Sequence, residues 1–281
     1  MVTIASSLAS AQLAIGRIEA RVLLREVLRQ DDAYLLAHGA DALTATQAQQ
    51  YDVLVARRVA GEPVAYITGR REFYGRDFAV TPAVLIPRHE TELLVELALQ
   101  RLPAGAPHRV LDLGAGSGCI GITIAAERPQ VQVTLVDASD AALEIARANA
   151  ARWAPANTTL LRSDWYAAIA AEHYDLIVAN PPYVAGGDPH LAQGDLRFEP
   201  QSALAAGADG LDDIRRIIAG APEHLTPGGW LLFEHGHDQA AACAQLLAVA
   251  GFQDVITAPD LANIPRVSGG RWMHDFPARM P

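Results

Sequence analysis

The feature that most constrains the fold of this 281-residue sequence is a regular alternation of strand-like and helix-like segments from residue 109 onward. Short runs rich in β-branched and aliphatic residues predict strands over Arg109–Leu113, Gln132–Asp137, Thr158–Ser163, Asp175–Ala179, Trp230–Glu234, Phe252–Thr257 and Arg271–Phe276. Helical periodicity separates most of these strands, over Cys119–Glu127, Ala141–Trp153, Asp212–Leu225 and Gln239–Val249. The alternation predicts an α/β fold with a mostly parallel, doubly wound sheet, and such sheets bind ligands at the carboxyl ends of their strands.

The N-terminal part of the sequence has a different pattern. From about Ile4 to Arg58 the apolar residues recur at helical spacing, which predicts a small helical bundle. Over residues 61–87 aromatic and β-branched residues are interrupted by Gly and Pro, which favours extended segments or a hairpin, and helix is expected again over Thr91–Leu102. We therefore predict a helical domain over 1–70, a linker or hairpin over 71–90 and an α/β domain over 91–281.

A glycine-rich loop connects the first predicted strand to the helix that follows it. Its residues are Gly114, Ala115, Gly116, Ser117 and Gly118. Glycine lets the backbone turn sharply and approach a ligand closely, and the start of the next helix offers unpaired N–H groups to an anion. The loop is a candidate cofactor site, although such a loop by itself is also compatible with an ordinary tight turn.

Polar residues at the ends of the next two predicted strands narrow the choice of cofactor. Asp137 ends the second strand, where a carboxylate can accept hydrogen bonds from both hydroxyls of a ribose, as it also would in a nicotinamide dinucleotide site. The GxGxG spacing, in place of GxGxxG, and the residues Asp164 and Trp165 favour S-adenosylmethionine instead. Asp164 can accept from an adenine amino group and Trp165 can cover the ring, with helix capping and simple core packing as the respective alternatives.

The fourth predicted strand ends in Asn180-Pro181-Pro182-Tyr183, at the sheet edge where this fold places its chemistry. Consecutive prolines are rigid and lack N–H groups, so the carbonyl groups nearby stay free to accept hydrogen bonds. The side-chain oxygen of Asn180 and the carbonyl oxygen of Pro181 can each accept one hydrogen of an amide NH2 group, and the Tyr183 ring can lie against that planar group. Holding both hydrogens aligns the nitrogen with a methyl donor and favours positive charge on it in the transition state. A plain strand-ending turn is the alternative.

Composition excludes several other chemistries. All 22 basic residues are arginine, so a Schiff-base amine and the Tyr/Lys pair of many reductases are absent. The formal net charge of -10 argues against sequence-blind adhesion to nucleic acid. The two cysteines suit a reducing compartment, and no apolar run is long enough to span a bilayer. We expect a cytoplasmic monomer without membrane contact or direct, specific nucleic-acid binding.

Two groups of ionisable residues are candidates for a metal site or an acid–base pair. His235 and His237 lack a third ligand at a convincing spacing, so no metal is expected. Glu90 and Glu92 are expected to form a solvated helix start, where acidic residues suit the helix dipole, in preference to an acid–base pair.

Several blocks, spread over nearly the whole chain, match one known family. They are EPVAYITGRREFYG from Glu62, LIPRHETELLVE from Leu85, DLGAGSG from Asp112, SDW from Ser163, NPPYV from Asn180, DLRFEPQSALAAGADGL from Asp195 and LLFEHG from Leu231. In these blocks the sequence resembles the release-factor glutamine methyltransferases (HemK/PrmC). The resemblance implies a seven-stranded methyltransferase sheet and a small N-terminal helical domain that helps to hold the substrate. The substrate it implies is the glutamine of the Gly-Gly-Gln motif of peptide chain release factors, methylated on its side-chain amide nitrogen from S-adenosylmethionine.

Carried over by position, the family places Gly114 to Gly118, Asp137, Trp165 and Asn180 against the cofactor, and Asn180 to Tyr183 around the glutamine. One departure is His89, where the family usually has proline in PR-P-(E/D)-T-E; the change would loosen a helix start but removes no group that the chemistry needs. The NPPY element also occurs in enzymes that methylate exocyclic amino groups of DNA or RNA bases. A base methyltransferase, a ribosomal-protein glutamine methyltransferase and a nicotinamide-dependent oxidoreductase are therefore the competing interpretations.

Overall fold

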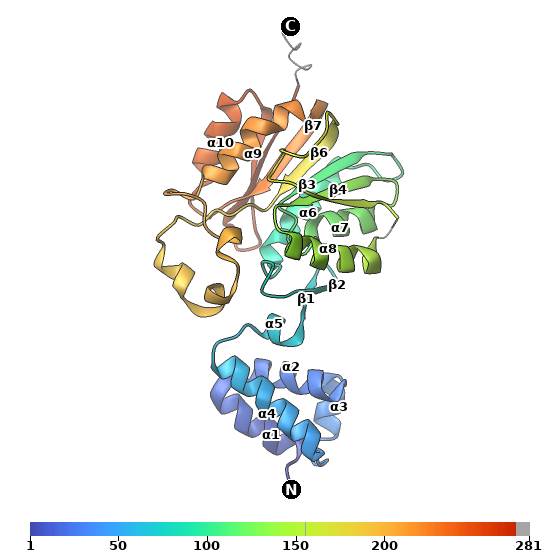
Figure 1. The fold of residues 1–281 in the computed structure, drawn as a ribbon, viewed down its shortest axis with the longest axis vertical. Coiled ribbons are helices and arrows are strands. Elements are labelled where there is room, and N and C mark those ends of the chain that lie inside the picture. The colour runs from blue at the N-terminus through green and yellow to red at the C-terminus, as the bar shows by residue number, and fades with distance from the viewer. Residues whose placement is uncertain (155, 274–281) are drawn as a thin grey trace. The chain divides into compact units, whose positions relative to one another are not determined.

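A computed structural model of the protein describes residues 1–154 and 156–273 (Figure 1). The chain divides into two compact units. One unit combines Met1–Arg70 with the short segment Gln193–Phe198, and the other combines Arg71–Ala192 with Glu199–Pro281. None of the described helices has both the length and the apolarity needed to cross a membrane.

The first unit is a small helical bundle, as predicted from the apolar spacing over residues 4–58. Its helices are α1 Ile4–Ile15, α2 Arg17–Leu28, α3 Asp32–Ala37, α4 Ala45–Val59 and α5 Val64–Thr68. Leu23 and Leu24 of α2 are completely buried in its core. Thr3 and Thr44 form capping boxes that satisfy the free N–H groups at the starts of α1 and α4, which is why these helices begin where they do.

The segment Gln193–Phe198 belongs to the helical unit although it follows the fourth strand of the sheet in sequence. Asp195 accepts a hydrogen bond of 2.8 Å from Arg58 in α4, and the same guanidinium bonds Glu19 of α2 at 2.6 Å. Local pattern does not reveal this grouping, because Arg58 and Asp195 lie 137 residues apart.

The second unit contains a seven-stranded sheet, which confirms the predicted fold class. The strands run in the order β5-β4-β3-β6-β7-β9-β8, and all neighbouring pairs are parallel except those of β9 with β7 and β8. Their bounds are β3 Arg109–Leu113, β4 Gln132–Asp137, β5 Thr158–Arg162, β6 Tyr174–Ala179, β7 Leu225–Glu234, β8 Gln253–Pro259 and β9 Pro265–Arg271.

The register of the sheet brings the carboxyl ends of its parallel strands to one edge. Leu113 of β3 pairs with Val136 of β4 on one side and with Ala179 of β6 on the other, and Ala179 in turn pairs with Phe233 of β7. The strand order reverses between β3 and β6, where open α/β sheets form a crevice. Asp137 and Glu234 end strands at this edge, and the glycine-rich loop and Asn180 directly follow strands there.

Helices cover both faces of the sheet (Figure 1). They are α6 Glu92–Arg101, α7 Cys119–Glu127 and α8 Asp140–Trp153 on one face, and α9 Asp212–Gly220 and α10 Ala240–Val249 on the other. Alternate side chains of each central strand enter opposite cores, as Val110 and Leu111 of β3 do. The central strands are buried on both faces, which explains their continuous apolar sequences.

The stretch predicted as extended or hairpin contains both a hairpin and a short helix. Strands β1 Arg70–Phe73 and β2 Arg76–Ala79 form the expected hairpin. The preceding residues Val64–Thr68 form α5, so an extended conformation was the wrong expectation there. Pro63 precedes this helix with a φ of -57°, and Gly69 ends it in the left-handed conformation at a φ of 71°, which only glycine adopts without strain.

The last strand also differs from the prediction. A strand over Arg271–Phe276 was expected, whereas β9 spans Pro265–Arg271, and residues 274–276 lie outside the described part of the chain. The observed strand has the sequence PRVSGGR, and proline and glycine are uncommon inside strands. Its glycines serve close packing, because a Cβ atom on Gly269 would collide with the Leu231 carbonyl oxygen and one on Gly270 would lie 2.8 Å from Phe252 Cβ.

The helix predicted over Asp212–Leu225 is shorter than expected. Helix α9 ends at Gly220, a 3-10 turn over Ala221–Glu223 follows, and Leu225 already belongs to β7. Pro222 lies in that turn and has no N–H group with which to continue the α-helical hydrogen bonds, so the helix stops before it.

Candidate functional site

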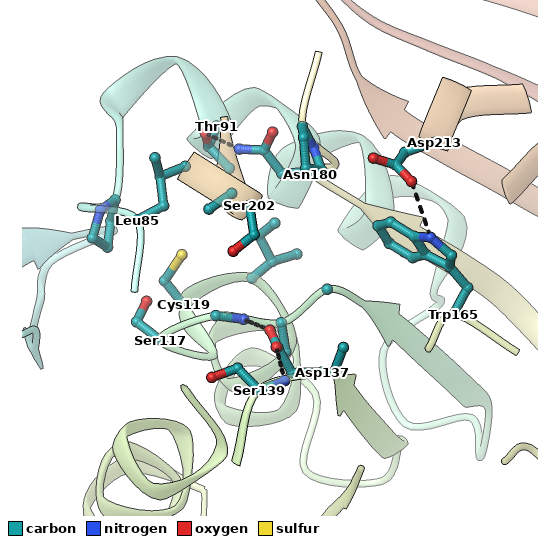
Figure 2. A pocket seen from close by; sticks show the side chains of 18 of the residues that line it. Leu85, Thr91, Ser117, Cys119, Asp137, Ser139, Trp165, Asn180, Ser202 and Asp213 are labelled. Carbon is teal, nitrogen blue, oxygen red and sulfur yellow. Dashed lines mark hydrogen bonds between the residues drawn. The ribbon is translucent and has the colours of Figure 1, made fainter. Parts of the chain in front are cut away.

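A cavity of about 430 Å³ opens at the carboxyl ends of β3, β4 and β6 (Figure 2). It brings together most of the residues predicted to form the site, from segments far apart in sequence. The residues lining it include Leu85, Pro87, Arg88, Thr91, Gly114, Ala115, Gly116, Ser117, Cys119, Asp137, Ser139, Asp164, Trp165, Asn180, Pro182, Ser202, Asp213 and Arg216. Three of the predicted residues, Gly118, Pro181 and Tyr183, do not line it.

The glycine-rich loop and Asp137 form one hydrogen-bonded wall of the cavity. Gly116 N donates to Asp137 Oδ2 at 2.9 Å, and Ser139 N donates to Asp137 Oδ1 at 2.8 Å, as Figure 2 shows. Gly114 and Gly116 adopt φ values of 69° and 55°, which are left-handed. Each carboxylate oxygen keeps a lone pair, so Asp137 can still accept hydrogen bonds from a ligand.

Trp165 is held against the glycine-rich loop. A Cβ atom on Gly114 would lie 3.2 Å from its ring, and its Nε1 donates to Asp213 Oδ1 at 3.2 Å (Figure 2). The ring is partly buried against the core on the α9 side of the sheet and also lines the cavity. Trp165 therefore packs against the core and also faces the cavity.

Asp164 has a different environment from the one expected for an adenine acceptor. Its side chain is 61% exposed, and both of its carboxylate oxygens lie 2.9 Å from a guanidinium nitrogen of Arg216. The helix-capping alternative is wrong, because a turn and not a helix follows. Ser163 stabilises that turn by accepting from Ala168 N at 3.0 Å.

Asn180 lies in the cavity with its amide group oriented by a single partner. Its Nδ2 donates to Thr91 Oγ1 at 3.2 Å, as Figure 2 shows. Its Oδ1 is buried, and within the described residues no donor lies within hydrogen-bonding distance of it. Buried polar atoms are almost always paired, so this oxygen is the acceptor that a ligand in the cavity would satisfy.

Behind Asn180 lies a buried carboxylate that the sequence patterns did not single out. Glu234 is 1% exposed; its Oε2 accepts from Thr91 Oγ1 at 2.6 Å and its Oε1 accepts from Tyr183 Oη at 3.0 Å. Burial raises the pKa of Glu234, and the two hydroxyl donors oppose that rise. Burial beside the same carboxylate raises the pKa of the Tyr183 phenol, which stays protonated and donating.

Two sequence comparisons decide the family. Residues 89–197 match the family model described as methyltransferase small domain, and residues 2–69 match the PrmC N-terminal domain. A release factor glutamine methyltransferase of Xylella fastidiosa (strain Temecula1) is 52% identical over 264 residues, which cover 94% of this chain and 96% of that protein. This chain belongs to the release factor glutamine methyltransferase family.

A second relative supports the release factor glutamine methyltransferase family, and a solved structure supports the fold. A member from Bordetella pertussis is 52% identical over 257 residues, covering 91% of this chain and 95% of that protein. A crystal structure of a methyltransferase from Pyrococcus furiosus is 18% identical, with a TM-score of 0.54 and coverage of 78% of this chain and 98% of that chain. The latter likeness shows the fold alone.

In this member of the release factor glutamine methyltransferase family, two of the matching sequence blocks meet at the rim of the cavity. Arg88, from the LIPRHE block, donates to Glu199, from the RFEP block, and Glu199 Oε2 also accepts from Ile86 N at 3.2 Å. The Glu199 side chain is fully buried. The pairing of Arg88 with Glu199 could not be predicted from the sequence, because the two residues lie 111 positions apart. Glu234, by contrast, could have been found from its position at the end of a predicted strand.

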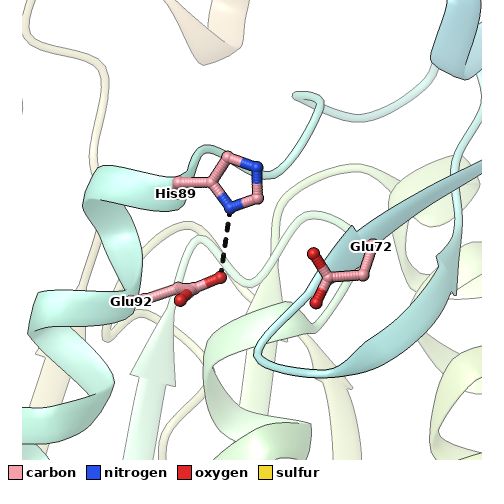
Figure 3. A group of neighbouring side chains, drawn as sticks. All are labelled: Glu72, His89 and Glu92. Atoms are coloured by element: carbon pink, nitrogen blue, oxygen red, sulfur yellow. Dashed lines mark hydrogen bonds and ion pairs between the residues drawn. The ribbon is translucent and has the colours of Figure 1, made fainter.

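A group of possible metal ligands lies outside the cavity. Glu72 of β1, His89 of the 3-10 turn His89–Thr91 and Glu92 of α6 place one ligand atom each within 4.8 Å of one another (Figure 3). His89 Nδ1 lies 3.3 Å from Glu92 Oε1, whereas His235 bonds Ser268 Oγ at 2.9 Å within the core.

The chemistry of the cavity is expected to be independent of this group. None of Glu72, His89 and Glu92 lines the cavity, and the hydrogen bonds that orient Asn180 and Asp137 involve none of the three. We expect dialysis against EDTA to leave the rate of methyl transfer unchanged. A loss of rate that Zn²⁺ or Mn²⁺ restores would contradict this expectation.

The burial of Asp112, near the end of β3, makes the free energy of unfolding depend on pH. Asp112 is completely buried, and this burial raises its pKa from 3.8 to about 7, against the lowering effect of the Gly121 N–H bond. The folded state therefore binds this proton more tightly than the unfolded state does. Its contribution to stability is present below the unfolded pKa and is lost as pH rises towards about 7.

Replacement of Asp112 with asparagine tests this linkage. The amide cannot ionise, so the fall in the free energy of unfolding from about pH 5 to about pH 8 should be smaller in Asp112→Asn than in the wild type. Urea unfolding followed by circular dichroism at both pH values measures it. Equal falls in the two proteins would show that Asp112 does not titrate over this range.

Proposed function

We propose that this protein transfers a methyl group from S-adenosylmethionine to the side-chain amide nitrogen of the glutamine in the Gly-Gly-Gln motif of peptide chain release factors. The observation that carries the proposal is that Asn180 lines the cavity and that its buried Oδ1 atom has no hydrogen-bond partner within the described residues. Membership of the release factor glutamine methyltransferase family supports the same substrate.

The residues around the cavity suit S-adenosylmethionine, which supplies an electrophilic methyl group when it is bound. A volume of about 430 Å³ is of the size that small-molecule sites have. Gly114 to Gly118 would hold the cofactor together with Asp137, whose two oxygens are oriented by backbone N–H groups, and Trp165, which Asp213 fixes in place. Asp164 lines the cavity beside its pair with Arg216 and remains a proposed cofactor contact.

The chemical task of the site is to make an amide nitrogen react. This nitrogen shares its lone pair with the neighbouring carbonyl group and is a poor nucleophile. Asn180 Oδ1 and the Pro181 carbonyl oxygen would accept one hydrogen each, which orients the nitrogen and stabilises the positive charge that develops on it. The amide nitrogen would take up the methyl group that the bound cofactor supplies in exchange for one of its own protons, which would pass to water. Pro182 and Tyr183 would keep the turn rigid.

The rest of the chain is proposed to serve substrate docking. The helical domain, over 1–70, would help to hold the release factor, the segment 71–90 would link it to the methyltransferase domain, and 91–281 would perform the transfer. The match of residues 2–69 to the PrmC N-terminal domain supports a separate role for the first of these. We further propose that the protein acts as a monomer in the cytoplasm.

Mass spectrometry of a substrate peptide tests the proposed function. The purified chain is incubated with S-adenosylmethionine and a full-length release factor, and the Gly-Gly-Gln peptide is analysed for one added methyl group on glutamine. A release factor carrying alanine at that glutamine is the matched control. Methylation of nucleic acid or of a ribosomal protein, with no change in the release factor, would overturn the proposal.

A further inference from the structure

A chain of hydrogen bonds connects the cavity to the carboxylate of Glu234. Asn180 Nδ2 donates to Thr91 Oγ1 at 3.2 Å, and Thr91 Oγ1 lies 2.6 Å from Glu234 Oε2. Glu234 Oε1 lies 3.0 Å from the Tyr183 hydroxyl. Glu234 is the last residue of β7, which pairs with β6. Only 1% of the residue is exposed, so water does not compete for hydrogen bonds with its carboxylate.

The direction of this chain follows from the number of hydrogens available. A threonine hydroxyl has one hydrogen, and the ionised form of Glu234, which the Thr91 and Tyr183 hydroxyl groups favour, can only accept. Once Thr91 donates that hydrogen to Glu234, its oxygen can only accept from Asn180, which must therefore turn its NH2 group towards Thr91. The Oδ1 atom of Asn180 is then the atom left without a partner among the described residues.

The opposite orientation of the Asn180 amide would replace the hydrogen-bond acceptor offered to a ligand with a donor. Its NH2 group would then point at the substrate and would meet the NH2 group of a glutamine side chain, donor against donor. The same orientation would suit a glutamate side chain, whose oxygens accept hydrogen bonds. The direction of the chain behind Asn180 thus decides which side chain the site accepts.

We infer that Glu234 is a positioning residue that, through Thr91, keeps Asn180 oriented as a hydrogen-bond acceptor and so makes the site select glutamine over glutamate. The inference rests on the proposed function of the cavity. Glu234 does not line the cavity, and it also anchors the Asn180-Tyr183 turn through the Tyr183 hydroxyl. A second bond, from Gln239 Nε2 to the Tyr183 carbonyl oxygen at 3.0 Å, holds the same turn.

The test replaces Glu234 with glutamine and measures turnover, cofactor affinity and substrate selection. The glutamine has nearly the same shape but can donate to Thr91, which frees the Thr91 hydrogen to bond Asn180 Oδ1. We expect kcat for the release factor to fall roughly 10- to 100-fold. The Kd for S-adenosylmethionine and the Tm should stay close to the wild-type values. These two measurements show that the fold and the cofactor site are intact.

Selection between glutamine and glutamate separates a positioning role from a structural one. The Kd values of two release factors, one with Gly-Gly-Gln and one with Gly-Gly-Glu, are measured for each variant. The wild type should bind the glutamine form more tightly, by roughly 10-fold or more. In Glu234→Gln this ratio should shrink towards one, which mere loosening of the structure would not produce.

Substitutions of Thr91 provide an independent test if Glu234→Gln does not fold. Thr91→Val keeps the shape but removes the hydroxyl, and should lose both turnover and selection, whereas Thr91→Ser restores the hydroxyl and should recover most of both. A wild-type Gln/Glu ratio in Glu234→Gln or in Thr91→Val would overturn the inference. Failure of the wild type to methylate the release factor would instead overturn the proposed function, so the two failures are distinguishable.

Discussion

Replacement of Asn180 with alanine is expected to lower kcat by about 100-fold or more while the affinity for S-adenosylmethionine changes little. Alanine removes the buried Oδ1 atom, which is the acceptor proposed to hold one hydrogen of the substrate amide. The glycine-rich loop and Asp137 keep their mutual hydrogen bonds, because neither depends on Asn180. Single-turnover methylation of the release factor, followed by mass spectrometry, measures the rate, and isothermal titration calorimetry measures cofactor binding.

An aspartate at position 180 is the companion variant for this experiment. It retains the size of asparagine and an oxygen in the cavity, but it cannot donate to Thr91 and places a negative charge next to Glu234. We expect Asn180→Asp to lose activity as well, with a lower Tm than Asn180→Ala because two carboxylates then share a buried site. Unimpaired turnover in Asn180→Ala would remove the acceptor role from the mechanism.

The second large effect is expected on stability, from Arg88→Met at the rim of the cavity. Glu199 is buried and bonds the Arg88 guanidinium, so loss of the arginine removes a charged hydrogen-bond donor from a buried carboxylate. Removing one partner of a buried ion pair typically costs about 3 kcal/mol or more. Because the Arg88 side chain is one-third exposed, solvent screens part of the pair, and we expect the loss in the free energy of unfolding to lie near the lower end of this range. Chemical unfolding of Arg88→Met and of the wild type measures the difference.

A double-mutant cycle with Glu199→Gln identifies the cause of that loss. Glutamine removes the buried charge and can still accept from Ile86 N, so Arg88→Met should destabilise the Glu199→Gln protein much less than it destabilises the wild type. An equal loss in both backgrounds would show that the apolar stem of Arg88, and not its charge, stabilises the rim.

The parts of the site that could be predicted are those with a signal inside one segment. Asp137 and Asn180 both follow strands with clear apolar patterns, and the ends of adjacent parallel strands must meet at one edge of the sheet. The glycines at 114 and 116 predicted a sharp backbone turn, and both residues adopt positive φ angles. Tyr183 was expected against the substrate plane, but its hydroxyl bonds Glu234 and the residue does not line the cavity.

The alternation of strands and helices, the α/β class that follows from it and the chemistry of the strand-ending residues could all be inferred from the amino-acid sequence. These depend on local periodicity and on steric properties of Gly and Pro that each segment carries alone. The folded structure was needed to show that Thr91 and Glu234 lie behind Asn180, that Arg88 pairs with Glu199, and that a glycine-rich segment forms β9. Those pairings join residues far apart in the chain, so their free energies arise only when the sheet has brought them together and excluded water.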